Sequence, residues 1–279
     1  MNRLAPVWDT LVGSNLWLAI GASMMTSASI YYLTGTWQGS FLAAWVFCAT
    51  LCLYNWHRLI SPHKESNNTS PLAQTNRRIV VGLTACTGIA ALVLFVFLPT
   101  RAQLSLLFPS LLGLSYSLPI LPGQTRLRDV PRLKILVLAS VWAWVVVYLP
   151  WLHLEIPIHG YSALVYAEKW LFFFAIAIAF DIRDVVFDKT RGTLTLPGKF
   201  GVNFAKILAQ FALLIAIGLS YYLYTSSYYT VAIFGGTTFS LLSTGVLIFF
   251  ASPQGSSYFY EGLLDGMLIL QPLAIWVLS

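Results

Sequence analysis

Long apolar stretches alternate with short polar segments along most of the chain. A membrane-spanning helix needs about 20 consecutive, mostly apolar residues, and stretches of this length recur from the first residues to the last. Nine such helices are predicted, at about 12–33, 39–59, 79–98, 102–121, 134–152, 162–180, 203–224, 228–250 and 259–278. The fourth is the least regular, because Pro109, Gly113 and Pro119 interrupt it.

Composition agrees with this pattern. Apolar residues make up 58% of the chain, charged residues only 9%, and the mean hydropathy is +0.75, whereas a soluble domain carries about 25% charged residues. We therefore predict an all-α, polytopic membrane protein. Residues 1–279 are expected to form one domain, a single bundle of about nine transmembrane helices around a cytoplasm-facing cavity.

The basic residues are unevenly divided between the two sides of this predicted bundle. We call the side that carries the amino terminus side A and the opposite side, side B. Of the 16 Lys and Arg residues, all except Arg101 and Lys169 fall on side A. Basic residues accumulate in cytoplasmic segments, so the amino terminus is expected in the cytoplasm and the carboxyl terminus outside, as in a bacterial inner membrane.

Three of the ten acidic residues, Asp181, Asp184 and Asp188, lie between the sixth and seventh predicted helices. If the sixth helix continues past Phe180, they occupy positions i, i+3 and i+7 and fall within an arc of about 60°. Like charges on one helix face are unfavourable unless a cation lies among them. Oxygen ligands in this arrangement suit a hard divalent metal such as Mg²⁺.

Cations follow these carboxylates directly, at Lys189, Arg191 and Lys199. Carboxylates that hold a metal, next to basic side chains, are what a bound diphosphate needs. A solvated helix end with scattered charge is the alternative interpretation. It explains less, because the surrounding chain has so few charged residues.

From Asp181 to Gly201 the chain reads DIRDVVFDKTRGTLTLPGKFG. This segment resembles the second aspartate-rich motif of the UbiA superfamily of intramembrane prenyltransferases. Asp184 and Asp188 match the aspartate pair of that motif, and Asp181 matches its earlier acidic position. The remaining matches are Gly192, Thr195, Leu196 and Gly201.

A second segment supports the same resemblance. Tyr116-Ser117-x-Pro119, followed by Leu133-Lys134, resembles the YSxP…LK segment between the fourth and fifth helices of the family. The family also has nine helices and a cytoplasmic site. The specific motifs cover only about 40 residues of the chain.

The first aspartate-rich motif of the family is largely absent. At the end of the second predicted helix Asn55 is retained, but Trp56, Leu59 and His63 stand at the three aspartate positions. Trp and Leu cannot bind Mg²⁺, so one of the family's two metal sites should be missing or rebuilt. Arg58 either replaces that metal as a fixed cation or remains in the loop of an enzyme that lost activity.

The resemblance implies transfer of an isoprenyl group from an isoprenyl diphosphate to a hydrophobic or aromatic acceptor. It implies that Asp181, Asp184 and Asp188 hold at least one Mg²⁺ ion, with Asp184, Asp188 and Arg58 acting in catalysis. The residues expected to bind the diphosphate are Asn55, Tyr116, Lys134, Lys189 and Arg191. The partners expected are these substrates and the lipid bilayer, with no nucleic acid.

Two other functions stay open. One is a catalytically degenerate homologue that binds or presents an isoprenoid lipid, which the missing first motif also permits. The other is a small transporter, which is disfavoured because the sequence suggests no charged residue in the middle of a span and no repeated halves. Glu261 and Asp265, near the side A end of the last predicted helix, either line the cavity or pair with loop cations.

Overall fold

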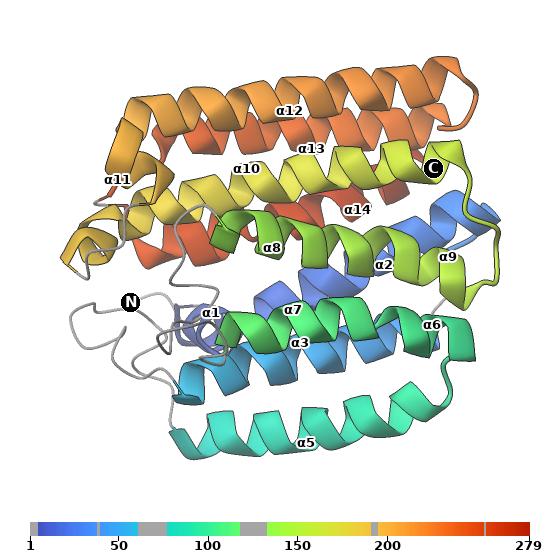
Figure 1. Ribbon diagram of the computed structural model, residues 1–279, viewed down its shortest axis with the longest axis horizontal. Coiled ribbons are helices and arrows are strands. Elements are labelled where there is room, and N and C mark those ends of the chain that lie inside the picture. Colours follow the sequence, from blue (N-terminus) through green and yellow to red (C-terminus); the bar gives the residue numbers. More distant parts are fainter. Residues whose placement is uncertain (1–4, 38–39, 61–76, 118–132, 191–194, 254) are drawn as a thin grey trace.

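A computed structural model describes residues 5–37, 40–60, 77–117, 133–190, 195–253 and 255–279 of the chain. Within these ranges the regular elements are all helices. Their axes lie roughly side by side in one elongated bundle (Figure 1). The predicted all-α class is therefore confirmed for the described residues.

The first half of the chain forms helices of 6 to 20 residues, and the longer ones run back and forth along the bundle. Their bounds are α1 Ala5–Gly13, α2 Leu16–Thr34, α3 Phe41–Ile60, α5 Arg77–Val96, α6 Thr100–Ser105, α7 Leu107–Ser117 and α8 Leu133–Ala143. The irregular fourth helix is divided into α6 and α7 at Leu106, while Pro109 falls in the first turn of α7, where a missing N–H is tolerated.

The second half contains the longest helix and two π-helical segments, η4 and η5. The bounds are η4 Trp144–Tyr148, α9 Leu149–His153, α10 Gly160–Thr190, α11 Leu196–Phe200, α12 Val202–Thr225, α13 Val231–Phe250, η5 Tyr258–Leu264 and α14 Met267–Leu278. Segment η4 continues α8 into α9 just before Pro150, and its wider turn suits a residue that cannot donate to the regular ladder.

Six helical stretches among the described residues are long and apolar enough to cross a membrane, at 16–34, 77–96, 133–153, 202–225, 231–250 and 258–278. The other predicted spans correspond to α3, to the divided pair α6 and α7, and to α10, whose apolar run is interrupted by Glu168 and Lys169. Helix α1 and the carboxyl end of α14 lie at opposite ends of the bundle (Figure 1).

Helix α10 organises the bundle. It packs along α8 and α12, and its buried residues form the centre of the main apolar core. At 1.5 Å per residue its 31 residues extend about 46 Å, which exceeds a hydrocarbon layer of about 30 Å. The last turns of α10 therefore reach beyond an apolar layer that its first 20 residues would span.

Small residues let the last helix approach its neighbours closely. A Cβ atom on Gly236 of α13 would lie 2.5 Å from the Ile275 nitrogen of α14, and one on Gly21 of α2 would lie 2.8 Å from the Leu268 Cβ. Glycine at these two points permits backbone contact between helices, a common device in membrane bundles. Helix α14 is thereby held against α13 and α2, and the π-helical segment η5 precedes it directly.

Candidate functional site

The three aspartates of the DIRDVVFDK segment lie on the last three turns of α10. The predicted continuation of the helix past Phe180 is confirmed, so the three carboxylates emerge from one side of it. Asp181 is 2% exposed and Asp184 is 8% exposed, whereas Asp188 is half-buried. Ile182 and Val185 are buried between them and hold this part of α10 against the protein.

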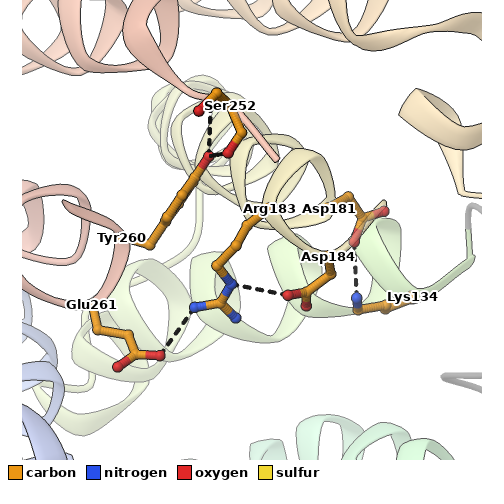
Figure 2. Close-up of polar contacts among 7 residues, drawn as sticks. All are labelled: Lys134, Asp181, Arg183, Asp184, Ser252, Tyr260 and Glu261. Carbon is orange, nitrogen blue, oxygen red and sulfur yellow. Dashed lines mark hydrogen bonds and ion pairs between the residues drawn. The ribbon is translucent and has the colours of Figure 1, made fainter. Parts of the chain in front are cut away.

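Asp181 is paired with a cation from a neighbouring helix. The Lys134 Nζ atom, in the first turn of α8, donates to Asp181 Oδ1 at 2.8 Å (Figure 2). The two residues are 47 positions apart in the chain. The structure thus brings together a predicted metal ligand and a predicted diphosphate-binding cation.

Asp184 and Glu261 share a second cation, Arg183. The Arg183 Nε atom donates to Asp184 Oδ1 at 2.9 Å, and its NH1 group donates to Glu261 Oε1 at 3.0 Å. Figure 2 shows the guanidinium between the two carboxylates, which come from α10 and from η5. The alternative that Glu261 pairs with a cation is therefore correct, but the cation is on α10 and not in a loop.

Aromatic rings and a π-helical turn fix the position of this pair. The guanidinium carbon of Arg183 lies 4.8 Å from the Phe180 ring centroid and 5.6 Å from that of Tyr260. The Tyr260 hydroxyl donates to the Ser252 carbonyl at 2.7 Å and accepts from the Ser252 N–H at 2.9 Å. These contacts anchor the π-helical turn η5 and direct Glu261 towards α10.

Asn55, the retained residue of the first motif, and the nearby Arg58 lie at a different junction. Asn55 is fully buried, and its Oδ1 accepts from Asn15 Nδ2 at 2.8 Å. Arg58 donates to the Gly13 carbonyl at the end of α1. Asn15 has a left-handed backbone, with φ of 60°, so these contacts order the turn between α1 and α2.

Several other predicted site residues lie near helix ends or outside the described ranges. Trp56, which stands at an aspartate position of the first motif, is 54% exposed. Lys189 is exposed at the end of α10, and Tyr116 belongs to the last turn of α7. Arg191 and His63 lie outside the described residues, as do the rest of 61–76, 118–132 and 191–194.

An aromatic cluster connects the helices that carry the predicted site. Trp142 Nε1 of α8 donates to the Tyr54 hydroxyl of α3 at 3.0 Å, and the two rings pack edge to face. The Trp142 ring also packs against Phe173 of α10, with 5.3 Å between the ring centroids. Tyr54 precedes Asn55, so this cluster lies next to the degenerate first motif.

The fit of these residues to a divalent metal depends on their cationic partners. Carboxylate oxygens are the right donors for Mg²⁺. In the part of the chain that the structure describes, however, three or more acidic, His or Cys side chains do not gather around one point. Asp181 and Asp184 instead contact Lys134 and Arg183. A metal held by this set therefore requires those two cations to turn away.

Sequence reasoning missed a second group of charges, inside the bundle. Glu168 and Lys169 of α10 are both fully buried, and Lys169 Nζ contacts Glu168 Oε1 at 2.9 Å. Lys169 Nζ also donates to Gln271 Oε1 of α14 at 2.9 Å, and the Tyr229 hydroxyl donates to Glu168 Oε2 at 2.7 Å. Lys169, which was counted among the side B cations, is fully buried within α10, and the expectation of no charged residue in the middle of a span is wrong for this helix. A Glu-Lys dipeptide within an apolar run was the available signal.

Comparison with solved structures finds the same fold in several proteins. Over 97% of this chain and 98% of the other, it matches a UbiA homologue from Archaeoglobus fulgidus bound to GPP and Mg²⁺, with a TM-score of 0.66 and 12% identity. It matches an apo UbiA homologue from Aeropyrum pernix K1 over 100% and 98% of the two chains, with a TM-score of 0.59 and 17% identity.

A digeranylgeranylglyceryl phosphate synthase is similar over 98% of both chains, with a TM-score of 0.60 and 14% identity. Neither a protein-family model nor a curated protein sequence matches this chain. The chain therefore has a UbiA-like fold along essentially its whole length. This likeness is one of three-dimensional structure, at sequence identities of 12–17%.

Proposed function

We propose that this protein transfers an isoprenyl group from an isoprenyl diphosphate to a hydrophobic or aromatic acceptor within the membrane. The observation that carries the proposal is the group of carboxylates and cations at the side A end of α10. It lies on the segment that resembles the second aspartate-rich motif, in a fold shared with a structure that contains GPP and Mg²⁺.

The proposed reaction exchanges one bond for another. The bond between the first carbon of the isoprenyl group and the diphosphate oxygen breaks, and the diphosphate leaves with the electron pair. The nucleophilic atom of the acceptor forms a new bond to that carbon and loses a proton. The developing negative charge on the diphosphate needs cations, and the positive charge on the isoprenyl group needs an apolar, electron-rich environment.

Basic side chains of this protein can stabilise the negative charge on the diphosphate. We assign Lys134, Lys189 and Arg191 to the diphosphate, together with Asn55 and Tyr116, and we assign Arg58 the place of the missing first metal. Because Lys134 is only partly buried, it can exchange Asp181 for a phosphate oxygen. The aromatic cluster of Tyr54, Trp142 and Phe173 is suited to shield the allylic cation from water.

The same exchange of partners would couple metal binding to diphosphate binding. When the diphosphate takes Lys134 and Arg183 as partners, the carboxylates of Asp181, Asp184 and Asp188 become available as Mg²⁺ ligands. A bound Mg²⁺ would neutralise charge on the leaving diphosphate. We therefore expect Mg²⁺ alone to bind weakly and to bind better when a diphosphate is present.

The decisive experiment measures pyrophosphate release by the purified protein in detergent. Geranyl, farnesyl and geranylgeranyl diphosphates are each supplied with a panel of aromatic and lipid acceptors, with Mg²⁺ present or chelated. Acceptor-dependent release supports the proposal. Absence of release from every pair, with retained binding of an isoprenyl diphosphate, would instead identify a protein that binds or presents isoprenoid lipids.

Arg58 is tested in the same assay. Arg58→Ala should lower release or diphosphate affinity more than about tenfold if its guanidinium faces the diphosphate. Arg58→Lys should restore only part of the loss, because Lys lacks the planar fork. Unchanged release would limit Arg58 to its contact with the Gly13 carbonyl.

The proposed orientation in the membrane has an independent test. Cysteines introduced at 66–70 and 122–125 should be labelled from the cytoplasmic side only, and one added after Ser279 from the outside only. The uneven distribution of basic residues motivates this expectation. Labelling of 66–70 from outside would contradict the orientation and the expected nine spans.

A further inference from the structure

Arg183 contacts carboxylates from two different helical elements at the end of α10. Its Nε faces Asp184 of the proposed metal set, and its NH1 faces Glu261 on η5. Because Glu261 lies outside the DIRDVVFDK segment, 78 positions further along the chain, the two contacts can be altered separately.

The balance of charge at the site explains the importance of Glu261, the second carboxylate that Arg183 contacts. In the described part of the chain, Lys134 forms an ion pair with Asp181, and Arg183 forms ion pairs with Asp184 and Glu261. A diphosphate brings further negative charge, so it can be accommodated only if cations turn towards it. An Arg183 held by Asp184 alone would lose its last anchor in that movement, whereas Glu261 gives it a second one.

The surroundings of Arg183 favour such a fixed pivot. The rings of Phe180 and Tyr260 lie against the guanidinium, and the double hydrogen bond between Tyr260 and Ser252 holds the second ring in place. The π-helical turn brings Glu261 to this point, and such turns are frequent at functional sites. Arginine suits the role because its planar fork contacts two anions at once.

We propose that Glu261 is a positioning residue that keeps Arg183 at the site while Arg183 exchanges Asp184 for the diphosphate. This inference rests on the proposed function and adds to it a fixed cation for the leaving group. It also supplies a fixed positive charge on the second motif, in a chain whose first motif has lost its acidic positions.

The inference predicts effects of opposite sign on metal binding. In Arg183→Gln, Asp184 loses a competing cation, so Mg²⁺ without any diphosphate should bind at least about threefold more tightly. In Glu261→Gln, Arg183 loses its ion pair with the second carboxylate and stays on Asp184. It therefore competes more strongly for Asp184, so Mg²⁺ alone should bind more weakly. Both variants should bind inorganic pyrophosphate about tenfold more weakly than the unaltered protein, because the anchored cation is lost or misplaced.

The experiment is calorimetric titration of detergent-purified protein with Mg²⁺, with inorganic pyrophosphate, and with both. Arg101→Gln is the matched control, since it removes an exposed cation from α6, and α6 lies at the opposite end of the bundle from the carboxyl end of α10 (Figure 1). Its affinities should be unchanged. Arg183→Lys should recover part of the pyrophosphate affinity, and Glu261→Asp should lie between Glu261→Gln and the unaltered protein.

The outcomes separate this inference from the function on which it rests. If the unaltered protein binds pyrophosphate and Glu261→Gln binds both ligands equally well, the positioning role is wrong and the proposed function stands. If both variants shift Mg²⁺ affinity in the same direction together with the melting temperature, the pair is structural only. If the unaltered protein neither binds nor releases pyrophosphate, the proposed function and the inference both fail.

Discussion

Helix α10 carries two charged groups that have opposite relations to solvent. Near its beginning, Glu168 and Lys169 are fully buried and contact Gln271 and Tyr229. Near its end, Asp181, Arg183 and Asp184 form pairs whose cations are 21–24% exposed. Lys169 lies about 14 Å along α10 from Gly160 and about 18 Å before Asp181.

This difference indicates which ion-pair partners a bound ligand can replace. The buried group has partners on α14 and in the connection between α12 and α13, and it is fully buried, so a ligand would have to open the bundle to replace any contact. At the end of α10 the cations are partly exposed, so a diphosphate can replace the carboxylates that they contact. We infer that the first group joins helices and that the second binds substrate.

The energetics support this division. Removing one partner of a buried ion pair leaves an uncompensated charge and costs about 3–5 kcal/mol, whereas exposed pairs contribute about 0–1 kcal/mol. Variants of the buried group should therefore change stability, and variants of the exposed group should change ligand binding. The following predictions test that separation from the largest expected effect to the smallest.

Lys169→Met should produce the largest effect. It leaves Glu168 buried without its cation, so the free energy of unfolding should fall by about 3–5 kcal/mol, measured by denaturation in detergent micelles. The double variant Glu168→Gln with Lys169→Met should regain much of this loss, because the unpaired charge is gone. Arg101→Met serves as the control for loss of an exposed cation. A Lys169→Met protein as stable as the control would remove the structural role.

Asp184→Asn should affect activity instead of stability. The side chain keeps its shape but loses the charge that holds Arg183 and that would bind Mg²⁺, so pyrophosphate release should fall at least about 100-fold, or about 2.7 kcal/mol in activation free energy. Its melting temperature should stay within a few degrees of the unaltered protein. Retained release in Asp184→Asn and Asp188→Asn would contradict the site.

Lys134→Ala is the counterpart of Lys169→Met in the exposed group. Because Lys134 is about a quarter exposed, its loss should lower the free energy of unfolding by less than Lys169→Met does, although Asp181 is buried at 2% exposed. Pyrophosphate affinity should nevertheless fall about tenfold, or about 1.4 kcal/mol. The two quantities are measured on the same preparation, and a large stability loss without a binding loss would reverse our assignment of the two groups.

Tyr229→Phe should give the smallest measurable effect. It removes only the hydroxyl that donates to Glu168, so the free energy of unfolding should fall by about 1 kcal/mol, with pyrophosphate affinity unchanged. Tyr228→Phe is the matched control, since the ring of Tyr228 stacks on that of Tyr161 and this contact is kept. Equal stability of the two variants would show that the Tyr229 hydroxyl contributes little.

Apolar patterning and local spacing were enough to predict the class of protein and to point to a candidate site. Nearly continuous apolar stretches leave no alternative to helices in a membrane, because backbone groups must be satisfied within each segment. The spacing of Asp181, Asp184 and Asp188 is a property of local helix geometry, so their common face could be predicted from residue numbers alone. The resemblance to UbiA prenyltransferases followed from the same segment, and the fold agrees with it.

Only the tertiary structure decided which charges meet. The contacts of Lys134 with Asp181 and of Arg183 with Glu261 join residues 47 and 78 positions apart, and no local pattern specifies such pairs. The buried pair of Glu168 and Lys169 has the same origin, since its stability depends on Gln271 and Tyr229 from other elements. Packing of whole helices sets these distances, and charge compensation over them is a property of the assembled bundle.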